Sequence, residues 1–159
     1  MLYTTYNYKS LFNHNLSLFA NIIYNNFIHL VKYPELQHNL ETITNTLYNK
    51  NTLLIICFDD NYKYILGYLL GYYIILNDGR HVFYISYIFV SHFMRNKHIG
   101  SNLIDLCISH SKKISFITGI LLTCNTFDKK LLSFYKNKHF FLDSFLKNNK
   151  QFDLFFKSI

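Results

Sequence analysis

The stretch Ile88–Ile104, IFVSHFMRNKHIGSNLI, contains the strongest structural signal in the chain. It opens with β-branched and aromatic residues that suit a buried strand ending at Val90. A short basic loop follows, and from Ile99 the apolar residues recur at helical spacing. The stretch therefore predicts a strand, a polar loop and a helix in direct succession.

A junction of this kind is a candidate anion site. The first N–H groups of a helix have no intrahelical acceptor and lie at the positive end of the helix dipole, so they bind phosphates. Gly100 removes the side chain where a ligand would approach the backbone, and Arg95, Lys97 and His98 add positive charge beside it. Many strand–loop–helix turns contain a glycine and a lysine without binding a ligand, so a purely structural role stays open on these residues alone.

The segments before this stretch are expected to form strands. Thr52–Phe58 and Tyr62–Leu76 are apolar, β-branched runs, and Asn77-Asp78-Gly79 has the composition of a hairpin turn. The second run is long enough to require a bend near Gly67 or Gly71.

The whole chain alternates between helical and strand patterns. We expect, in chain order, helices over Leu11–Val31 and Leu40–Tyr48, strands over Thr52–Phe58, Tyr62–Leu76 and Val82–Val90, a helix from Ile99 to Lys113, a strand over Ile117–Cys124, a helix capped by Asp128, and strands over Phe140–Phe145 and Phe152–Phe156. This mixed order predicts one α/β domain, residues 1–159, with helices flanking a mixed sheet. The strand–helix–strand crossover predicts that Val82–Val90 and Ile117–Cys124 are adjacent and parallel.

Composition narrows the class of protein. The chain has 159 residues, half of them hydrophobic, and a formal net charge of +7. Its Lys and Arg residues are scattered along the sequence, which argues against a nucleic-acid-binding protein. They are either solvated surface residues or the positively charged entrance to a site for an anionic ligand. The apolar run Tyr64–Leu76 is interrupted by two glycines and too short to span a membrane. The N-terminus lacks the pattern of a signal peptide.

The three cysteines, Cys57, Cys107 and Cys124, lie far apart in apolar surroundings. An odd number without C-x-x-C spacing fits reduced thiols in a cytoplasmic protein. Cys107 and His110 have no second pair of potential ligands, so no metal site is expected.

Two motifs resemble those of one enzyme family. Arg95–Gly100, RNKHIG, resembles the acetyl-CoA pattern [Q/R]-x-x-G-x-[G/A] of the GNAT N-acetyltransferase superfamily, with His98 at the first glycine position. Asp128–Phe140, DKKLLSFYKNKHF, resembles that family's N-x-x-A-x-x-F/L-Y-x-x-x-G-F, with His139 at the glycine position. We expect His98 to keep the helix-start geometry, because Gly100 remains, and His139 to require a left-handed backbone. The order of the elements is also similar to GNAT proteins.

The resemblance implies an acetyl-CoA-dependent N-acetyltransferase with assigned sites. The pantetheine arm and acetyl carbonyl would bind backbone groups of Ile88, Phe89 and Val90, in a gap where the strand separates from its parallel neighbour. The cofactor contacts would further include Arg95, Asn96, Lys97, His98, Ile99, Gly100 and Ser101 at the pyrophosphate, and Asp128. Tyr135 aligns with the tyrosine that protonates the departing thiolate; without the motif it would be an ordinary core aromatic.

The general base and the acceptor are less defined. No carboxylate lies between His81 and Val90. The weakly polar strand around Tyr84 resembles the one in protein N-terminal acetyltransferases, some of which use a tyrosine and ordered water to deprotonate the amine. The histidine that some of them carry on the next strand is replaced by Thr123, and His81 and His92 are alternative bases. The acceptor is an amine-bearing small molecule or a protein N-terminus or lysine, and the chain a monomer or homodimer. A catalytically silent GNAT-like binding or interaction module is the alternative.

Overall fold

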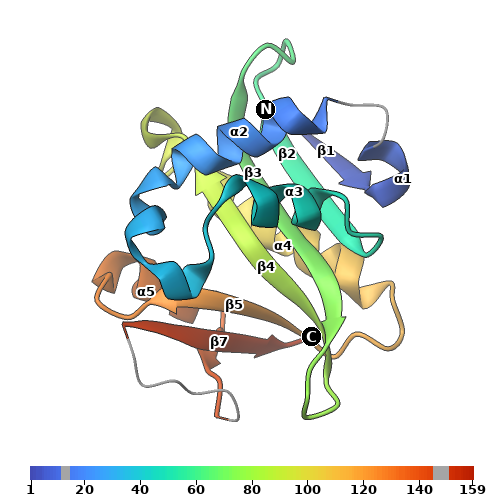
Figure 1. The fold of residues 1–159 in the computed structure, drawn as a ribbon, viewed down its shortest axis with the longest axis vertical. Coiled ribbons are helices and arrows are strands. Elements are labelled where there is room, and N and C mark those ends of the chain that lie inside the picture. The colour runs from blue at the N-terminus through green and yellow to red at the C-terminus, as the bar shows by residue number, and fades with distance from the viewer. Residues whose placement is uncertain (12–14, 145–150) are drawn as a thin grey trace.

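The computed structural model describes residues 1–11, 15–144 and 151–159. Within them, a seven-stranded sheet has the order β1-β2-β3-β4-β5-β7-β6 (Figure 1). Its strands are β1 (Leu2–Asn7), β2 (Thr52–Phe58), β3 (Ile65–Ile75), β4 (His81–Val90), β5 (Gly119–Asn125), β6 (Phe141–Leu142) and β7 (Phe152–Ser158). The helices are α1 (Tyr8–Leu11), α2 (Leu16–Asn26), α3 (Leu40–Leu47), α4 (Ile99–Lys112) and α5 (Lys129–Asn137), with 3-10 turns η1 (Ile28–Lys32), η2 (Pro34–Leu36) and η3 (His92–Met94). This is the mixed α/β architecture that the sequence predicts.

The helices cover both faces of the sheet. Figure 1 shows α2 and α3 in front of the strands and α4 behind them. Alternate residues of each strand therefore enter different cores. On β3, Leu69 packs with α4 and α5, whereas Tyr68 and Leu70 pack with α2 and α3.

A β-bulge interrupts the alternation on β4. Gly71 of β3 pairs with Ile85 and Leu70 pairs with Tyr87, which leaves Ser86 as an extra residue. A Cβ on Gly71 would lie 2.2 Å from the carbonyl oxygen of Tyr84, so only glycine fits opposite the bulge. The irregularity lies at one of the two glycines where the sequence predicts a bend. Because of the bulge, Tyr84 and Tyr87 face the same side of the sheet although they are three residues apart.

β4 and β5 are adjacent and parallel, as predicted, but they pair over only half of β4. The ladder runs from Val82↔Gly119 to Ile85↔Leu122. β4 then continues to Val90 without pairing with β5, while β5 stays paired with β7 as far as Asn125. The two strands therefore separate beyond the bulge, which confirms the predicted gap.

The N-terminal part of the sequence prediction needs correction. β1 was not expected; its Tyr and Thr residues favour an extended chain, and it forms an edge strand that pairs with β2 over its whole length. The helix expected over Leu11–Val31 is divided into the end of α1, then α2 and η1, and residues 12–14 of that prediction lie outside the described residues. Asn15 caps α2, since its side chain accepts a hydrogen bond from the N–H of Leu18 at 3.1 Å.

The C-terminal strands also differ from their predicted bounds. β5 begins at Gly119 rather than Ile117, because the N–H of Ile117 closes a turn on the carbonyl of Ile114. The strand expected over Phe140–Phe145 is reduced to Phe141–Leu142, and Phe140 is buried in the core beneath α5. Phe145 lies outside the described residues.

Candidate active site

A cavity of about 820 Å³ lies where β4 and β5 separate. Its walls come from both sides of the gap: Tyr84 to Ile88 of β4, Leu122, Thr123 and Asn125 near the end of β5, Asp128, Leu131 and Tyr135 around α5, and residues of η1, η2 and α3. Tyr33 of the η1–η2 segment packs edge-on against Phe152 of β7 at 4.7 Å between ring centroids, which fixes this segment beside the gap. The fold thus supplies a hollow at the point where the sheet is open.

The N-terminus of α4 has the properties of an anion site. Asn96 and His98 adopt left-handed backbone conformations, with φ of 62° and 59°, and His98 is the N-cap without a side-chain cap. Across the described parts of the chain, the N–H groups of Ile99, Gly100 and Ser101 have no acceptor, and the first helical bond runs from Asn102 N–H to His98 at 2.9 Å. These three N–H groups are free to bind an anion, and the histidine at the usual glycine position keeps the helix start.

The side chains around this helix start are arranged to leave its backbone open. Arg95 and Lys97 are exposed, and neither forms an ion pair with any residue that the structure describes. A Cβ on Gly100 would lie 3.5 Å from both Phe134 and Val90, which is ordinary contact. Alanine therefore fits at position 100.

The last residues of β4 connect this helix start to the cavity. Ile88 lines the cavity, Phe89 stacks on Tyr68 at 5.4 Å, and Val90 packs towards Gly100. Since β5 has separated from this part of β4, the edge from Ser86 to Val90 that faces β5 has no strand partner among the residues that the structure describes. It offers backbone N–H and C=O groups to an extended ligand.

Tyr135 is buried on α5 and lines the cavity. Asp128, which also lines the cavity, caps the helix as predicted by accepting a hydrogen bond from the N–H of Leu131 at 3.0 Å. Burial raises the pKa of Tyr135, and its hydroxyl forms no hydrogen bond with the described residues. The phenol is therefore protonated at neutral pH and available as a proton donor.

His139 allows the chain to turn directly after α5. Its φ of 61° is left-handed, as expected for a residue at the usual glycine position. The turn is closed by hydrogen bonds from Phe140 N–H to Tyr135 and from His139 N–H to Lys136, at 3.0 and 2.9 Å.

Tyr84 lies on the other wall of the cavity. Its hydroxyl is hydrogen-bonded to Thr123 Oγ1 at 2.9 Å, and its ring packs edge-on against Tyr72 at 5.9 Å. Burial raises the pKa of both phenols. Thr123, at the position where related enzymes carry histidine, thus contacts the tyrosine that the sequence singles out.

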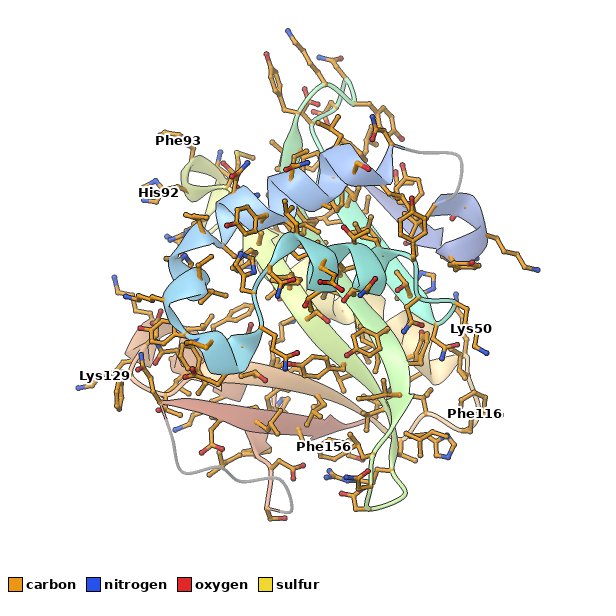
Figure 2. All side chains as sticks on the ribbon, in the orientation of Figure 1. Lys50, His92, Phe93, Phe116, Lys129 and Phe156 are labelled. Carbon is orange, nitrogen blue, oxygen red and sulfur yellow. The ribbon has the colours of Figure 1, made fainter. Side chains whose placement is uncertain are left out.

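The two histidines considered as alternative bases lie elsewhere. Figure 2 shows His92 beside Phe93 on the loop before α4, both pointing away from the molecule. His81 begins β4 at its other end and packs against Phe116 at 5.4 Å. Neither residue lines the cavity.

Sequence reasoning missed His38, a buried histidine between η2 and α3 that lines the cavity. Its Nδ1 lies 3.1 Å from the Tyr87 hydroxyl and its Nε2 lies 3.1 Å from the carbonyl oxygen of Tyr24. Burial raises the pKa of Tyr87 to about 12. A single histidine in a polar loop carries no sequence signal, so only the fold identifies this pair.

Two further properties of the described residues bear on membranes and metals. No helix among residues 1–11, 15–144 and 151–159 is long and apolar enough to cross a membrane. In the same ranges, no three His, Cys, Asp or Glu side chains are grouped as metal ligands.

Comparison with known proteins agrees with this geometry. Residues 19–140 match the acetyltransferase (GNAT) family, so the chain belongs to that family. No curated protein sequence matches significantly.

Solved structures with the same fold have low sequence identity. Arabidopsis thaliana NAA60 in complex with acetyl-CoA is 16% identical with a TM-score of 0.67, over 99% of this chain and 98% of that one. A GNAT acetyltransferase from Streptococcus pneumoniae is 15% identical with a TM-score of 0.66, over 99% and 98%. An aminoglycoside acetyltransferase, meta-AAC0020, from an uncultured soil metagenomic sample, in complex with sisomicin, is 14% identical with a TM-score of 0.60, over 86% and 85%.

Proposed function

We propose that this protein is an acetyl-CoA-dependent N-acetyltransferase that acetylates a primary amine of a small molecule, a protein N-terminus or a lysine. The observation that carries the proposal is the cavity at the β4–β5 gap, which Tyr135 and the β4 edge line from opposite sides. Acyl transfer from acetyl-CoA is the chemistry of the family, and the acceptor amine is the proposed part.

The residues of this chain suit each end of acetyl-CoA. The free N–H groups at the start of α4, with Arg95 and Lys97, suit the pyrophosphate. The unpaired edge of β4 suits the amide-bearing pantetheine arm, which would lead the thioester into the cavity.

The chemistry needs a polarised carbonyl, a neutral amine and a proton for the thiolate. Backbone N–H groups beyond the bulge would polarise the acetyl carbonyl. The amine nitrogen would attack the acetyl carbon, forming the N–C bond as the C–S bond breaks. Tyr135 would donate its proton to the departing thiolate, a role for which its place on the cavity wall and its hydroxyl, free of hydrogen bonds to the described residues, suit it.

Binding and turnover test the proposal separately. Acetyl-CoA should raise the melting temperature, because a ligand at 100 times its Kd stabilises the native state by about 2.7 kcal/mol. Release of CoA thiol should then depend on an added primary amine, for which a free-N-terminus peptide and propylamine serve as first probes. Stabilisation without turnover of any amine in a wider panel would indicate a binding module, and no stabilisation would overturn the cofactor site.

A further inference from the structure

We infer that His38 is the proton acceptor of the reaction, acting through the hydroxyl of Tyr87, which faces the acceptor amine. This inference rests on the proposed N-acetyltransferase function and deepens it, because it assigns the group that takes the proton of the amine, a step that the proposed function leaves open. The pair lies on the side of the sheet covered by α2 and α3.

The hydrogen bonds of His38 define its tautomer. The carbonyl oxygen of Tyr24 can only accept, so Nε2 carries the proton and donates to it at 3.1 Å. Nδ1 is then an unprotonated acceptor, and the hydroxyl of Tyr87 donates to it at 3.1 Å. The buried histidine is thus a neutral base with its one free lone pair directed at a phenol.

Packing keeps this pair in place. The His38 ring stacks parallel to the Tyr24 ring, with an interplanar angle of 7° and 5.3 Å between centroids. Phe27 packs against both His38 and Tyr87. The bulge at Ser86 turns Tyr87 to the same face as Tyr84, and both line the cavity. Tyr84 and Tyr87 would thereby approach the acceptor amine from the same side of the sheet.

Several titratable or charged groups lie around His38. Tyr24 from α2 and Tyr87 from β4 contact the ring. Around the same cavity, the charged or titratable groups from other elements include His29, Lys32, Glu35 and Asp128. None of these forms a salt bridge to His38 within the described residues, so no fixed counter-ion holds the imidazole.

The protons balance over one turnover. The acceptor ammonium gives one proton to the Tyr87 oxygen while the Tyr87 proton moves to His38 Nδ1, which leaves a neutral amine and an imidazolium. After attack, the thiolate takes the Tyr135 proton. As the amide forms, the nitrogen gives its second proton to the Tyr135 oxygen, which restores the phenol. His38 then returns its proton to solvent. Tyr87 touches the substrate, and His38 is a positioning and proton-accepting residue behind it.

Three variants separate this role from packing. His38→Gln can keep both hydrogen bonds, with its amide N–H on Tyr24 and its amide oxygen accepting from Tyr87, but it cannot take a proton. Tyr87→Phe removes only the hydroxyl. Tyr68→Phe is the matched control, because Tyr68 is a buried phenol in the same core, hydrogen-bonded to Asn26 and outside the cavity.

The measurement is the pH profile of kcat/KM with acetyl-CoA and whichever of the peptide or propylamine the wild type acetylates. At neutral pH we expect a loss of about 100-fold in His38→Gln and in Tyr87→Phe, with no further loss in the double variant. The loss should shrink as pH rises and the amine deprotonates in solution. Tyr68→Phe should stay within about twofold of the wild-type kcat/KM, because the Tyr68 hydroxyl lies outside the cavity. Its loss should lower the stability of the protein and leave the reaction unaffected.

Each outcome decides something different. A loss that is independent of pH, or full activity in Tyr87→Phe, would overturn the proton route while leaving the N-acetyltransferase function intact. A wild type that binds acetyl-CoA but acetylates no amine would overturn the proposed function first. Nitrogen-15 NMR of histidine-labelled protein provides a check that needs no activity: a His38 protonated on Nδ1 instead of Nε2 would contradict the assigned tautomer.

Discussion

The two sides of the cavity are built in different ways. The side proposed for acetyl-CoA is one continuous segment, from Ile88 on β4 to Ser101 on α4, and it offers mainly backbone groups. The side proposed for the acceptor amine, called here the acceptor wall, is assembled from side chains that are distant in sequence, including His38, Tyr84 and Thr123. A shared cofactor can be held by local backbone geometry, whereas a particular acceptor needs side chains that only the tertiary fold brings together.

The largest effect is expected from a charge placed on the continuous side. Gly100→Glu should weaken acetyl-CoA binding by about 1000-fold, because setting a carboxylate beside a phosphate costs several kcal/mol and each 1.4 kcal/mol is about tenfold. Gly100→Ala is the control, since its Cβ finds only ordinary 3.5 Å contacts. Calorimetry with acetyl-CoA measures both, and unchanged affinity in Gly100→Glu with a native melting temperature would remove the phosphate site from the start of α4.

Tyr135 lines the same cavity from α5, and its loss should affect turnover alone. Tyr135→Phe removes a hydroxyl that forms no hydrogen bond in the described structure, so stability should change little. The loss of a general acid lowers kcat by about 100-fold or more, while acetyl-CoA affinity should stay near the wild-type value. Steady-state kinetics with binding measured in parallel tests this expectation. Full activity would make Tyr135 a packing aromatic between Phe134 and Phe140.

A smaller effect is expected from the exposed charges beside α4. Arg95→Ala should weaken acetyl-CoA binding by about tenfold, in the range of one hydrogen bond to a charged group, and the loss should shrink at high salt. Lys50→Ala is the matched control, because it removes one exposed cation at the opposite edge of the molecule from His92 and Phe93 (Figure 2). Equal losses in both variants would indicate a general charge effect instead of a local contact.

The same contrast explains what could be predicted from the sequence. The β4–loop–α4 unit and the α5 helix follow from local patterns, because caps, glycines and apolar spacing act within a few residues. The parallel pairing of β4 with β5 follows from the crossover, and His98 and His139 adopt the backbone of the glycines they replace.

The parts that sequence patterns did not predict depend on distant contacts. β1 exists as a strand through its pairing with β2, and the bulge at Ser86 is visible only opposite Gly71. The pair of His38 and Tyr87 joins residues 49 positions apart. No local pattern encodes such contacts, so the acceptor wall was the least predictable part of the site.

The smallest expected effect tests whether the acceptor wall is set by side-chain contacts at all. Thr123→Val keeps the shape of Thr123 but removes the hydrogen bond to the Tyr84 hydroxyl, worth about 1 kcal/mol. If Tyr84 is oriented by that bond, kcat/KM for the amine should fall about fivefold, with acetyl-CoA affinity unchanged. Thr118→Val is the control, because Thr118, directly before β5 and outside the cavity, also loses a hydroxyl bond, to the carbonyl of His81. Equal kinetics in the two variants would mean that Tyr84 is held by its packing on Tyr72 alone, and the acceptor wall would then depend on ring contacts more than on hydrogen bonds.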